Sequence, residues 1–362
     1  MRIVAAMSGG VDSSVAAALL ADQGHEVIGL SMQLYDQSNP DRAFGSCCSL
    51  DDLHDARRVA AAIRIPHYIM NFERQFDERV IANFVAEYTA GRTPLPCAHC
   101  NSDLKFATLA ERAATFGADA VATGHYARVE RDAASGRYLL RRGVDGDKDQ
   151  AYFLFSLTQD QLARASFPVG DRFKDTVREY ARERGLPVAD KPDSQEICFV
   201  PDHDYKAFVE RQAPALAAGQ SGGTIVDEEG VVVGRHDGVH RFTVGQRKGL
   251  GLASTPAAAP GAPLYVLALR PAAREVVVGP KASLERTTLT ASSVNWIVRA
   301  PEAPVRATVQ IRHRHAASPA TVRVLGPGHA AVLFDTPQIA VTPGQAAVFF
   351  DGDVVLGGGW ID

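Results

Sequence analysis

Residues 8–14 read Ser-Gly-Gly-Val-Asp-Ser-Ser, between the apolar runs Ile-Val-Ala-Ala-Met at 3–7 and Val-Ala-Ala-Ala-Leu-Leu at 15–20. This order predicts a strand, a glycine-rich turn and a helix. Such a turn directs backbone N–H groups and a helix N-terminus at one point, which suits a phosphate group. Gly9 and Gly10 permit close approach of the main chain to an anion. Asp12 is suited to capping the helix or holding a metal ion.

The spelling of this loop separates it from two other phosphate loops. No Gly-Lys-Ser/Thr ending is present, and there is no G-x-G-x-x-G pattern. The loop instead resembles the PP-loop of the ATP-pyrophosphatase superfamily. That resemblance implies cleavage of ATP between the α and β phosphates, with AMP placed on a carbonyl oxygen. The alternative is an ordinary tight turn between a strand and a well-capped helix.

Composition narrows the class of protein. The chain has 362 residues, 46% of them hydrophobic, which is typical of two or three globular domains. It has neither an apolar run of roughly 18 residues nor a signal-peptide pattern, so we expect a cytoplasmic protein without membrane contact. A net charge of −4 gives no general signature of nucleic-acid binding, so any RNA contact must come from local patches.

The periodicity predicts an α/β fold. Residues 1–203 alternate strands with helices, which indicates a doubly wound parallel-sheet PP-loop domain whose ligands lie beyond the carboxyl ends of the strands. Residues 204–277 predict a small β-rich central domain, and residues 278–362 a C-terminal β-barrel or sandwich. The strands are expected at 3–7, 26–32, 67–70, 118–123, 223–227, 230–234, 308–313, 320–325 and 346–350. The helices are expected at 11–23, 51–63, 76–90 and 104–116.

Five cysteines are too few and too unevenly placed for a disulfide framework. Cys97 and Cys100 lie in a Pro-rich loop, with Cys100 just ahead of a predicted helix whose N-terminus would favour a thiolate. Cys100 and Cys198 could form a redox pair; Cys97, Cys100 and Cys198 could hold a metal or an iron–sulfur cluster; or all three could be inert. The neighbouring residues Cys47 and Cys48 are expected to be inert.

The cysteines and the PP-loop together resemble the bacterial tRNA-specific 2-thiouridylase family over essentially the whole chain. The matching stretches are 6–14, 45–60, 91–106, 122–129, 148–157, 193–199, 242–251, 311–314 and 342–350. The resemblance implies ATP-dependent 2-thiolation of the wobble uridine of tRNA. It further implies Mg²⁺, a tRNA anticodon stem-loop as substrate, a persulfide donor (a cysteine desulfurase or a sulfur-relay protein) and a thiol reductant.

The resemblance also implies residue roles. Cys100 would be the nucleophile and Cys198 the persulfide carrier, with a disulfide between them after sulfur transfer. The ATP-binding residues would be Ala6, Met7, Ser8, Gly9, Gly10, Val11, Asp12, Ser13, Met32 and Gly124. The tRNA-binding residues would be Leu95, Pro96, Cys97, His125, Lys148, Asp149, Gln150, Arg312, His313 and Gln345. From the residues alone, 148–150 are more typical of a solvated turn, and 312–315 of a solvated strand.

Two departures from the family pattern bear on the chemistry. Many members have Asn-Pro-Asp where this chain has Leu95, Pro96 and Cys97, so an acidic residue with a proton-handling role is missing. Either that role lies elsewhere or Cys97 joins a three-thiolate site. His313 replaces a common Tyr and would stack more weakly on a base. The rival hypotheses are a PP-loop amide-forming ligase and a non-catalytic RNA-binding module, neither of which needs the cysteine pair.

Overall fold

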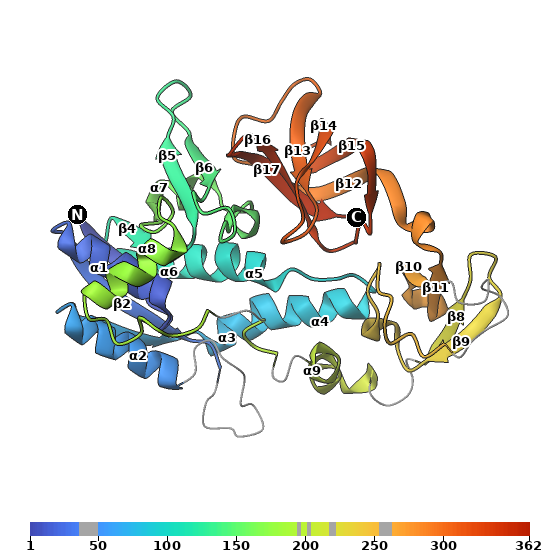
Figure 1. Cartoon of the computed structure of the whole chain (residues 1–362), viewed down its shortest axis with the longest axis horizontal. Helices are drawn as coiled ribbons and strands as arrows, with labels where there is room; N and C mark the ends of the chain where they lie inside the picture. Colours follow the sequence, from blue (N-terminus) through green and yellow to red (C-terminus); the bar gives the residue numbers. More distant parts are fainter. Residues whose placement is uncertain (36–49, 194–196, 201–203, 217–221, 253–262) are drawn as a thin grey trace.

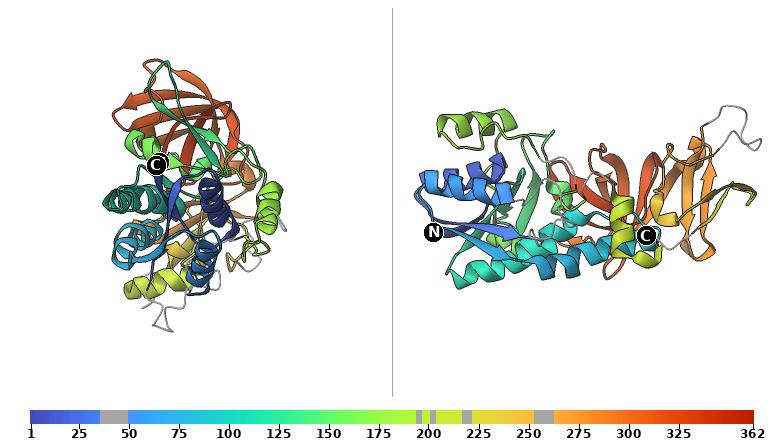
Figure 2. Two further views of the ribbon diagram at one scale, coloured as in Figure 1. Left: turned by 90° about the vertical axis from the view of Figure 1, so that its left-hand side faces the viewer. Right: turned by 90° about the horizontal axis from the view of Figure 1, so that it is seen from below.

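The computed structural model describes residues 1–35, 50–193, 197–200, 204–216, 222–252 and 263–362. The molecule is elongated, with an α/β unit at one end, a small β-rich unit at the other and a β-barrel between them (Figures 1 and 2). No helix within these described ranges is long and apolar enough to span a bilayer.

The α/β unit is built on five parallel strands in the order β3-β2-β1-β4-β7. They are β1 (Arg2–Ala6), β2 (Glu26–Gln33), β3 (His67–Asn71), β4 (Ala120–Ala122) and β7 (Ala165–Ser166). The chain winds outward in one direction from β1 and in the other from β4. The carboxyl ends of these two neighbours therefore form the switch point at which such sheets bind ligands. The predicted doubly wound parallel sheet is confirmed.

Helices cover both faces of this sheet. On one face α1 (Val11–Asp22), α2 (Leu50–Ala62) and α8 (Lys174–Glu183) share one apolar cluster with β1, and α8 packs against α1. The other face carries a second apolar cluster, formed in part by η2 (Asp77–Ile81), α4 (Ala82–Thr89), α6 (Phe106–Thr115) and α9 (Tyr205–Gln212). A short helix, α3 (Glu73–Phe76), precedes η2, and α7 (Gln159–Arg164) lies beside α6 and the strand Tyr138–Arg142.

The helix predicted at 104–116 begins earlier than expected. Helix α5 (Pro96–His99) runs into a π-helical turn, η3 (Cys100–Lys105), which continues into α6. Pro96 occupies the first helical position, where its missing N–H has no intrahelical partner to lose. The prediction that Cys100 lies just ahead of a helix is therefore wrong: Cys97 lies in the first turn, and Cys100 begins a π turn, an irregularity frequent at functional sites.

The central unit is a four-stranded sheet in the order β10-β11-β8-β9. Its strands are β8 (Gly223–Val226), β9 (Val232–His236), β10 (Tyr265–Arg270) and β11 (Glu275–Gly279). Helix α4 reaches this unit and contacts its short 3₁₀ turn at Val239–Arg241. The loop that leaves α4 then returns beneath the barrel towards α5 (Figure 1).

The C-terminal unit is a closed six-stranded barrel, because β12 pairs with both β15 and β17. Its strands are β12 (Glu285–Trp296), β13 (Val305–Gln310), β14 (Ser318–Gly326), β15 (His329–Ile339), β16 (Ala346–Asp351) and β17 (Val354–Ile361). The strand predicted at 308–313 ends at Gln310, so residues 312–315 lie in a turn and do not alternate across a sheet.

A hairpin from the α/β unit extends the barrel sheet. Strand β6 (Tyr138–Arg142) pairs with β17, and β5 (Ala127–Arg131) pairs with β6, which adds two strands to the six of the barrel. One apolar cluster, which includes Leu140, Phe155 and Phe350, spans this junction. The two units therefore share a core.

Candidate functional site

The loop after β1 is shaped by its own glycines and serines. Gly9 has φ of +76°, and a Cβ there would overlap the backbone carbonyl of Asp52, so only glycine fits. The Ser14 hydroxyl donates to the Gly10 carbonyl at 2.7 Å, and the Ser13 hydroxyl donates to the same oxygen at 3.2 Å. These bonds point back into the loop, so the serines hold its shape in this structure.

Helix α1 begins at the switch point without a capping side chain. Gly10 is its N-cap residue, and in the described part of the chain no side chain bonds to the first-turn N–H groups there. Asp12 therefore does not cap the helix. Gly124, which follows β4, lies directly against this turn: a Cβ on Gly124 would stand 2.5 Å from the Ser13 nitrogen and 2.6 Å from the Asp12 carbonyl carbon. The two predicted ATP-binding segments are thus in contact. Met32, near the carboxyl end of β2, is buried.

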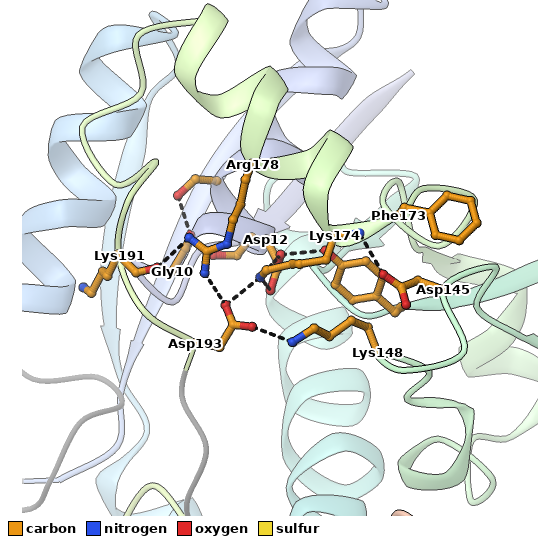
Figure 3. A network of polar contacts seen from close by, with 12 residues as sticks. Gly10, Asp12, Asp145, Lys148, Phe173, Lys174, Arg178, Lys191 and Asp193 are labelled. Carbon is orange, nitrogen blue, oxygen red and sulfur yellow. Dashed lines mark hydrogen bonds and ion pairs between the residues drawn. The ribbon is translucent and has the colours of Figure 1, made fainter.

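Asp12 belongs to a network of charged side chains (Figure 3). Lys174 Nζ donates to both oxygens of Asp12, at 2.7 and 2.8 Å, and the Tyr126 hydroxyl donates to Asp12 Oδ1 at 2.9 Å. Lys174 also bonds to Asp193 at 2.8 Å. Burial raises the pKa of the Tyr126 hydroxyl, and the neighbouring Asp12 carboxylate raises it further. Tyr126 therefore stays a hydrogen-bond donor.

Asp193 is the centre of the network. Its Oδ1 accepts from Lys174 at 2.8 Å and from Arg178 at 2.7 Å, and its Oδ2 accepts from Lys148 at 2.8 Å. Burial raises the pKa of the Asp193 carboxyl, but the hydrogen bonds from Lys148 and Lys174 outweigh this effect and lower the pKa to about 2. The hydrogen bond to Asp193 likewise raises the pKa of the Lys148 ammonium. The Asp193 carboxylate and the Lys148 ammonium are therefore both charged at neutral pH.

A second lysine fixes the outer side of the loop. Lys191 Nζ donates to the Gly9 carbonyl at 3.1 Å and to carboxylates of Asp52 and Asp55 at 2.6 and 2.7 Å. The segment that leads from Lys191 to Asp193 is therefore tied to the phosphate-loop candidate at both ends.

The cysteines differ in exposure. Cys97 is exposed, Cys100 is buried, and Cys198 is intermediate. Cys100 lies in the apolar cluster on the α4/α6 face of the sheet, and Cys198 packs against the same cluster. Phe199 anchors the Cys198 segment, since its ring lies 5.5 Å from that of Phe76 and 5.1 Å from that of Phe84, centroid to centroid. The fold thus brings both predicted reactive cysteines to one face.

The loop before Cys97 is held by the barrel. Gln345 Nε2 donates to the carbonyls of Thr93 and Pro94 at 3.1 and 3.2 Å, and the Thr93 N–H donates to the Pro343 carbonyl at 2.8 Å. Leu95 and Pro96 are buried. Of the predicted tRNA-binding residues in this region, only Cys97 is exposed.

Residues 148–150 are not a solvated turn in the structure. Asp149 accepts from Arg142 at 2.6 Å and from the Gly143 N–H at 2.9 Å. The Gln150 side chain accepts from the Tyr126 N–H at 3.0 Å. These bonds hold the loop in place beside the α1 end of the sheet.

The predicted tRNA-binding histidines have different surroundings. His125 bonds to Thr123 through Nδ1 at 2.7 Å and lies edge-on to Phe167. Burial, with the positive charge of Lys105, holds the pKa of His125 well below its usual range, so the ring is neutral. His313 is exposed in the turn after β13, next to the half-buried Arg312, and its ring lies 4.6 Å from that of Phe153.

Some predicted features lie outside this description. Cys47 and Cys48 fall in residues 36–49, beyond the described ranges. The described residues include Cys97, Cys100 and Cys198, and no group of three or more His, Cys, Asp or Glu side chains among them is arranged to hold a metal ion.

Sequence reasoning missed Lys174, Arg178, Lys191 and Asp193 as site residues. Lys174 and Asp12 are 162 residues apart, and no local pattern marks their contact. The one usable signal was the position of Asp193 at the start of the stretch 193–199, which the sequence had already singled out and which contains Cys198.

Comparison with known proteins covers all three units. A family model described as the tRNA methyl transferase HUP domain matches residues 1–202. Models described as the tRNA methyl transferase PRC-barrel domain and the aminomethyltransferase beta-barrel domain match residues 212–280 and 286–361.

Two curated relatives match along their whole length. The "tRNA-specific 2-thiouridylase MnmA" of Geotalea uraniireducens (strain Rf4) is 53% identical over 365 residues, which span 100% of this chain and 95% of the relative. The protein of the same name from Solibacter usitatus (strain Ellin6076) is 54% identical over 372 residues, 99% of each chain. A solved structure titled "Crystal structure of a 4-thiouridine synthetase - RNA complex with bound ATP" has 17% identity and a TM-score of 0.34, covering 60% of this chain and 51% of that one.

Proposed function

Because full-length relatives more than half identical to it are tRNA-specific 2-thiouridylases, this chain belongs to that family, and we propose that it adenylates the C2 oxygen of the wobble uridine and replaces it with persulfide sulfur. As a family member it is an enzyme that modifies tRNA, a sulfurtransferase. The domain models are described as tRNA methyl transferase domains, which is less specific than the full-length matches to 2-thiouridylases. The two cysteines also suit sulfur transfer. The observation that carries the proposal is the pairing of an uncapped, glycine-shaped loop at the switch point with two cysteines on one face of the same sheet.

The adenylation step belongs to the loop. A uracil C2 oxygen is a poor leaving group, and its transfer to the α-phosphate of ATP makes it part of AMP, which leaves readily. The N–H groups of the first turn of α1 are aimed at the switch point, where they stabilise the charge of the departing pyrophosphate. Mg²⁺ is typically held by one or two carboxylates together with substrate phosphates. Asp12, in the first turn of α1, is the carboxylate that would hold the ion here. The ion would neutralise phosphate charge.

The sulfur step belongs to the cysteines. A persulfide on Cys198 presents a terminal sulfur that attacks C2, and AMP departs with the original oxygen. The Cys100 thiolate then attacks the Cys198 sulfur, breaks the S–S bond to the transferred atom and forms a Cys100–Cys198 disulfide. Two electrons from a thiol reductant restore both thiols. The uridine must leave the anticodon stack to reach this site.

The cluster hypothesis makes a different use of the same residues. It needs Cys97, Cys100 and Cys198 as ligands of one group, and the described residues contain no such ready arrangement. Exposed Cys97 stands in place of the usual Asp, so in this chain another group handles the proton or Cys97 does so as a thiol.

The test uses anaerobically purified protein, whose iron and sulfide content and absorption spectrum are measured first. Thiolated uridine is then quantified in tRNA after incubation with ATP and a persulfide donor. We expect Cys100→Ser and Cys198→Ser each to abolish thiolation and to bind ATP normally, whereas Cys97→Ser retains thiolation. Product from either of the first two variants, or thiolation only in iron-loaded samples, contradicts the persulfide scheme. No thiolation of any tRNA by the wild type would restore the ligase hypothesis.

A further inference from the structure

Three cations surround a single carboxylate beside the loop. Lys148, Lys174 and Arg178 all bond to Asp193, which sits on the segment between α8 and Cys198 (Figure 3). Lys174 is almost fully buried, with 8% of its side chain exposed, and Arg178 is 20% exposed. Lys and Arg side chains make the same charge-assisted hydrogen bonds to phosphate groups as to carboxylates.

The position of this cluster connects it to the nucleotide. Lys174 is held by Asp12 in the first turn of α1, so the cations stand directly beside the uncapped helix N-terminus. The three cations and the two carboxylates of Asp12 and Asp193 together have a net charge of one positive unit. Without Asp193 the same groups would carry two, next to backbone N–H groups aimed at the same place. A polyphosphate carries more negative charge than a carboxylate and offers more acceptor oxygens.

We propose that Lys148, Lys174 and Arg178 form the binding site for the β- and γ-phosphates, and that Asp193 occupies this site as an internal anion when it is free of nucleotide. The inference rests on the proposed cleavage of ATP between the α and β phosphates. It moves Lys148 from the predicted tRNA contacts to the pyrophosphate site. Asp193 then competes with the phosphates on binding and, by returning, promotes release of pyrophosphate after adenylation.

The competition between Asp193 and the phosphates determines how far the pyrophosphate affinity should change. When an internal group fills a site in about nine of ten molecules, the apparent affinity of the external ligand falls about tenfold. Because the pKa of Asp193 lies near 2, its carboxylate remains a competitor throughout the neutral range. Removing its charge should therefore tighten the binding of pyrophosphate, which is the reverse of what removal of an ordinary site residue does.

The experiment measures the dissociation constant of inorganic pyrophosphate by calorimetry on the full chain, with and without Mg²⁺. Asp193→Asn and Asp193→Ala should each lower the constant about tenfold, while Lys148→Gln should raise it several-fold. Asp190→Asn is the matched control: its carboxylate lies in the same segment but is 83% exposed and pairs with Arg182 at 3.0 Å, away from Asp193, so it should leave the constant unchanged. Circular dichroism confirms that each variant is folded.

The outcomes separate the possibilities. Weaker pyrophosphate binding by both Asp193 variants, only when Mg²⁺ is present, would make Asp193 a metal ligand and overturn the proposal. An unchanged constant would also overturn it. Loss of tRNA binding by Lys148→Gln with unaltered pyrophosphate binding would return Lys148 to the tRNA contacts. Wild-type thiolation, measured on the same samples, tests the proposed function separately, because the pyrophosphate constants need no tRNA, sulfur donor or turnover.

Discussion

Gly124→Ala should damage the proposed ATP site through a steric contact that the structure defines closely. The added Cβ would lie 2.5 Å from the Ser13 nitrogen, whereas ordinary contacts begin near 3.4 Å. Backbone atoms, which cannot rotate away, are the obstacle, so the first turn of α1 must move by roughly 0.9 Å relative to the end of β4. Overpacking of this kind costs about 1–3 kcal/mol.

Part of that cost should appear in stability and part in affinity. For a domain of this size, about 1 kcal/mol shifts Tm by roughly 2–4 °C, so we expect a decrease between about 2 and 12 °C. Displaced N–H groups should weaken ATP binding about tenfold, equivalent to about 1.4 kcal/mol. Calorimetric titration with ATP and a thermal melt measure the two effects.

Gly146→Ala is the matched control, because a Cβ at Gly146 meets no atom within 4 Å. It should leave both Tm and ATP affinity as in the wild type. A Gly124→Ala variant with lowered Tm but normal ATP affinity would mean that the turn of α1 does not bind the phosphates. A variant normal in both respects would refute the steric argument itself.

Three further predictions follow from contacts described above. Gln345→Leu removes two hydrogen bonds to the loop before Cys97, worth about 0.5–1.5 kcal/mol each. The kcat for thiolation should therefore fall about tenfold, while the ATP dissociation constant stays unchanged. An equal loss of kcat and of ATP affinity would indicate a general folding defect. The Asp193 carboxylate contributes stability that is complete above its ordinary pKa of 3.8 and lost as pH falls through about 2. The Tm difference between wild type and Asp193→Asn should therefore be largest above pH 4 and become smaller below it. A Tm difference independent of pH would show that the charge of Asp193 does not stabilise the fold. Cys97→Asp restores the common family residue at an exposed position, and thiolation assayed from pH 6 to 9 should be at least as fast as in the wild type; an inactive, folded Cys97→Asp variant would show that the thiol itself is required.

The parts of this molecule that the sequence predicted correctly are those encoded locally. A strand, a glycine turn and an apolar helix lie next to one another along the chain, so β1, the loop and α1 could be located from pattern alone. The start of the helix that contains Cys100 could not be located from pattern alone. Pro94 and Pro96 are typical of a loop, although Pro96 is also compatible with the first position of a helix. The π turn has no 3.6-residue signature.

The charged network illustrates what pattern reasoning cannot reach. Asp193 and Lys148 are 45 residues apart, and Lys174 and Asp12 are 162 apart. Such pairs depend on the winding order of the sheet, which puts the ends of β1 and β4 together, and not on any spacing in the chain. Family resemblance gave Lys148 a role without its partner, so its contact with Asp193 emerged only from the fold.

The eight-stranded sheet that joins the β5–β6 hairpin to the barrel has an evolutionary consequence. Domains attached by a flexible tether can be lost, exchanged or recombined between genes, whereas this barrel shares a sheet edge and an apolar core with the α/β unit. A gene truncated after the first unit would leave β6 as an unpaired edge and expose Leu140 and Phe155 to water, both features that promote aggregation. We therefore expect the two units to be inherited as one piece, with insertions tolerated in exposed turns such as residues 133–136 at the tip of the β5–β6 hairpin.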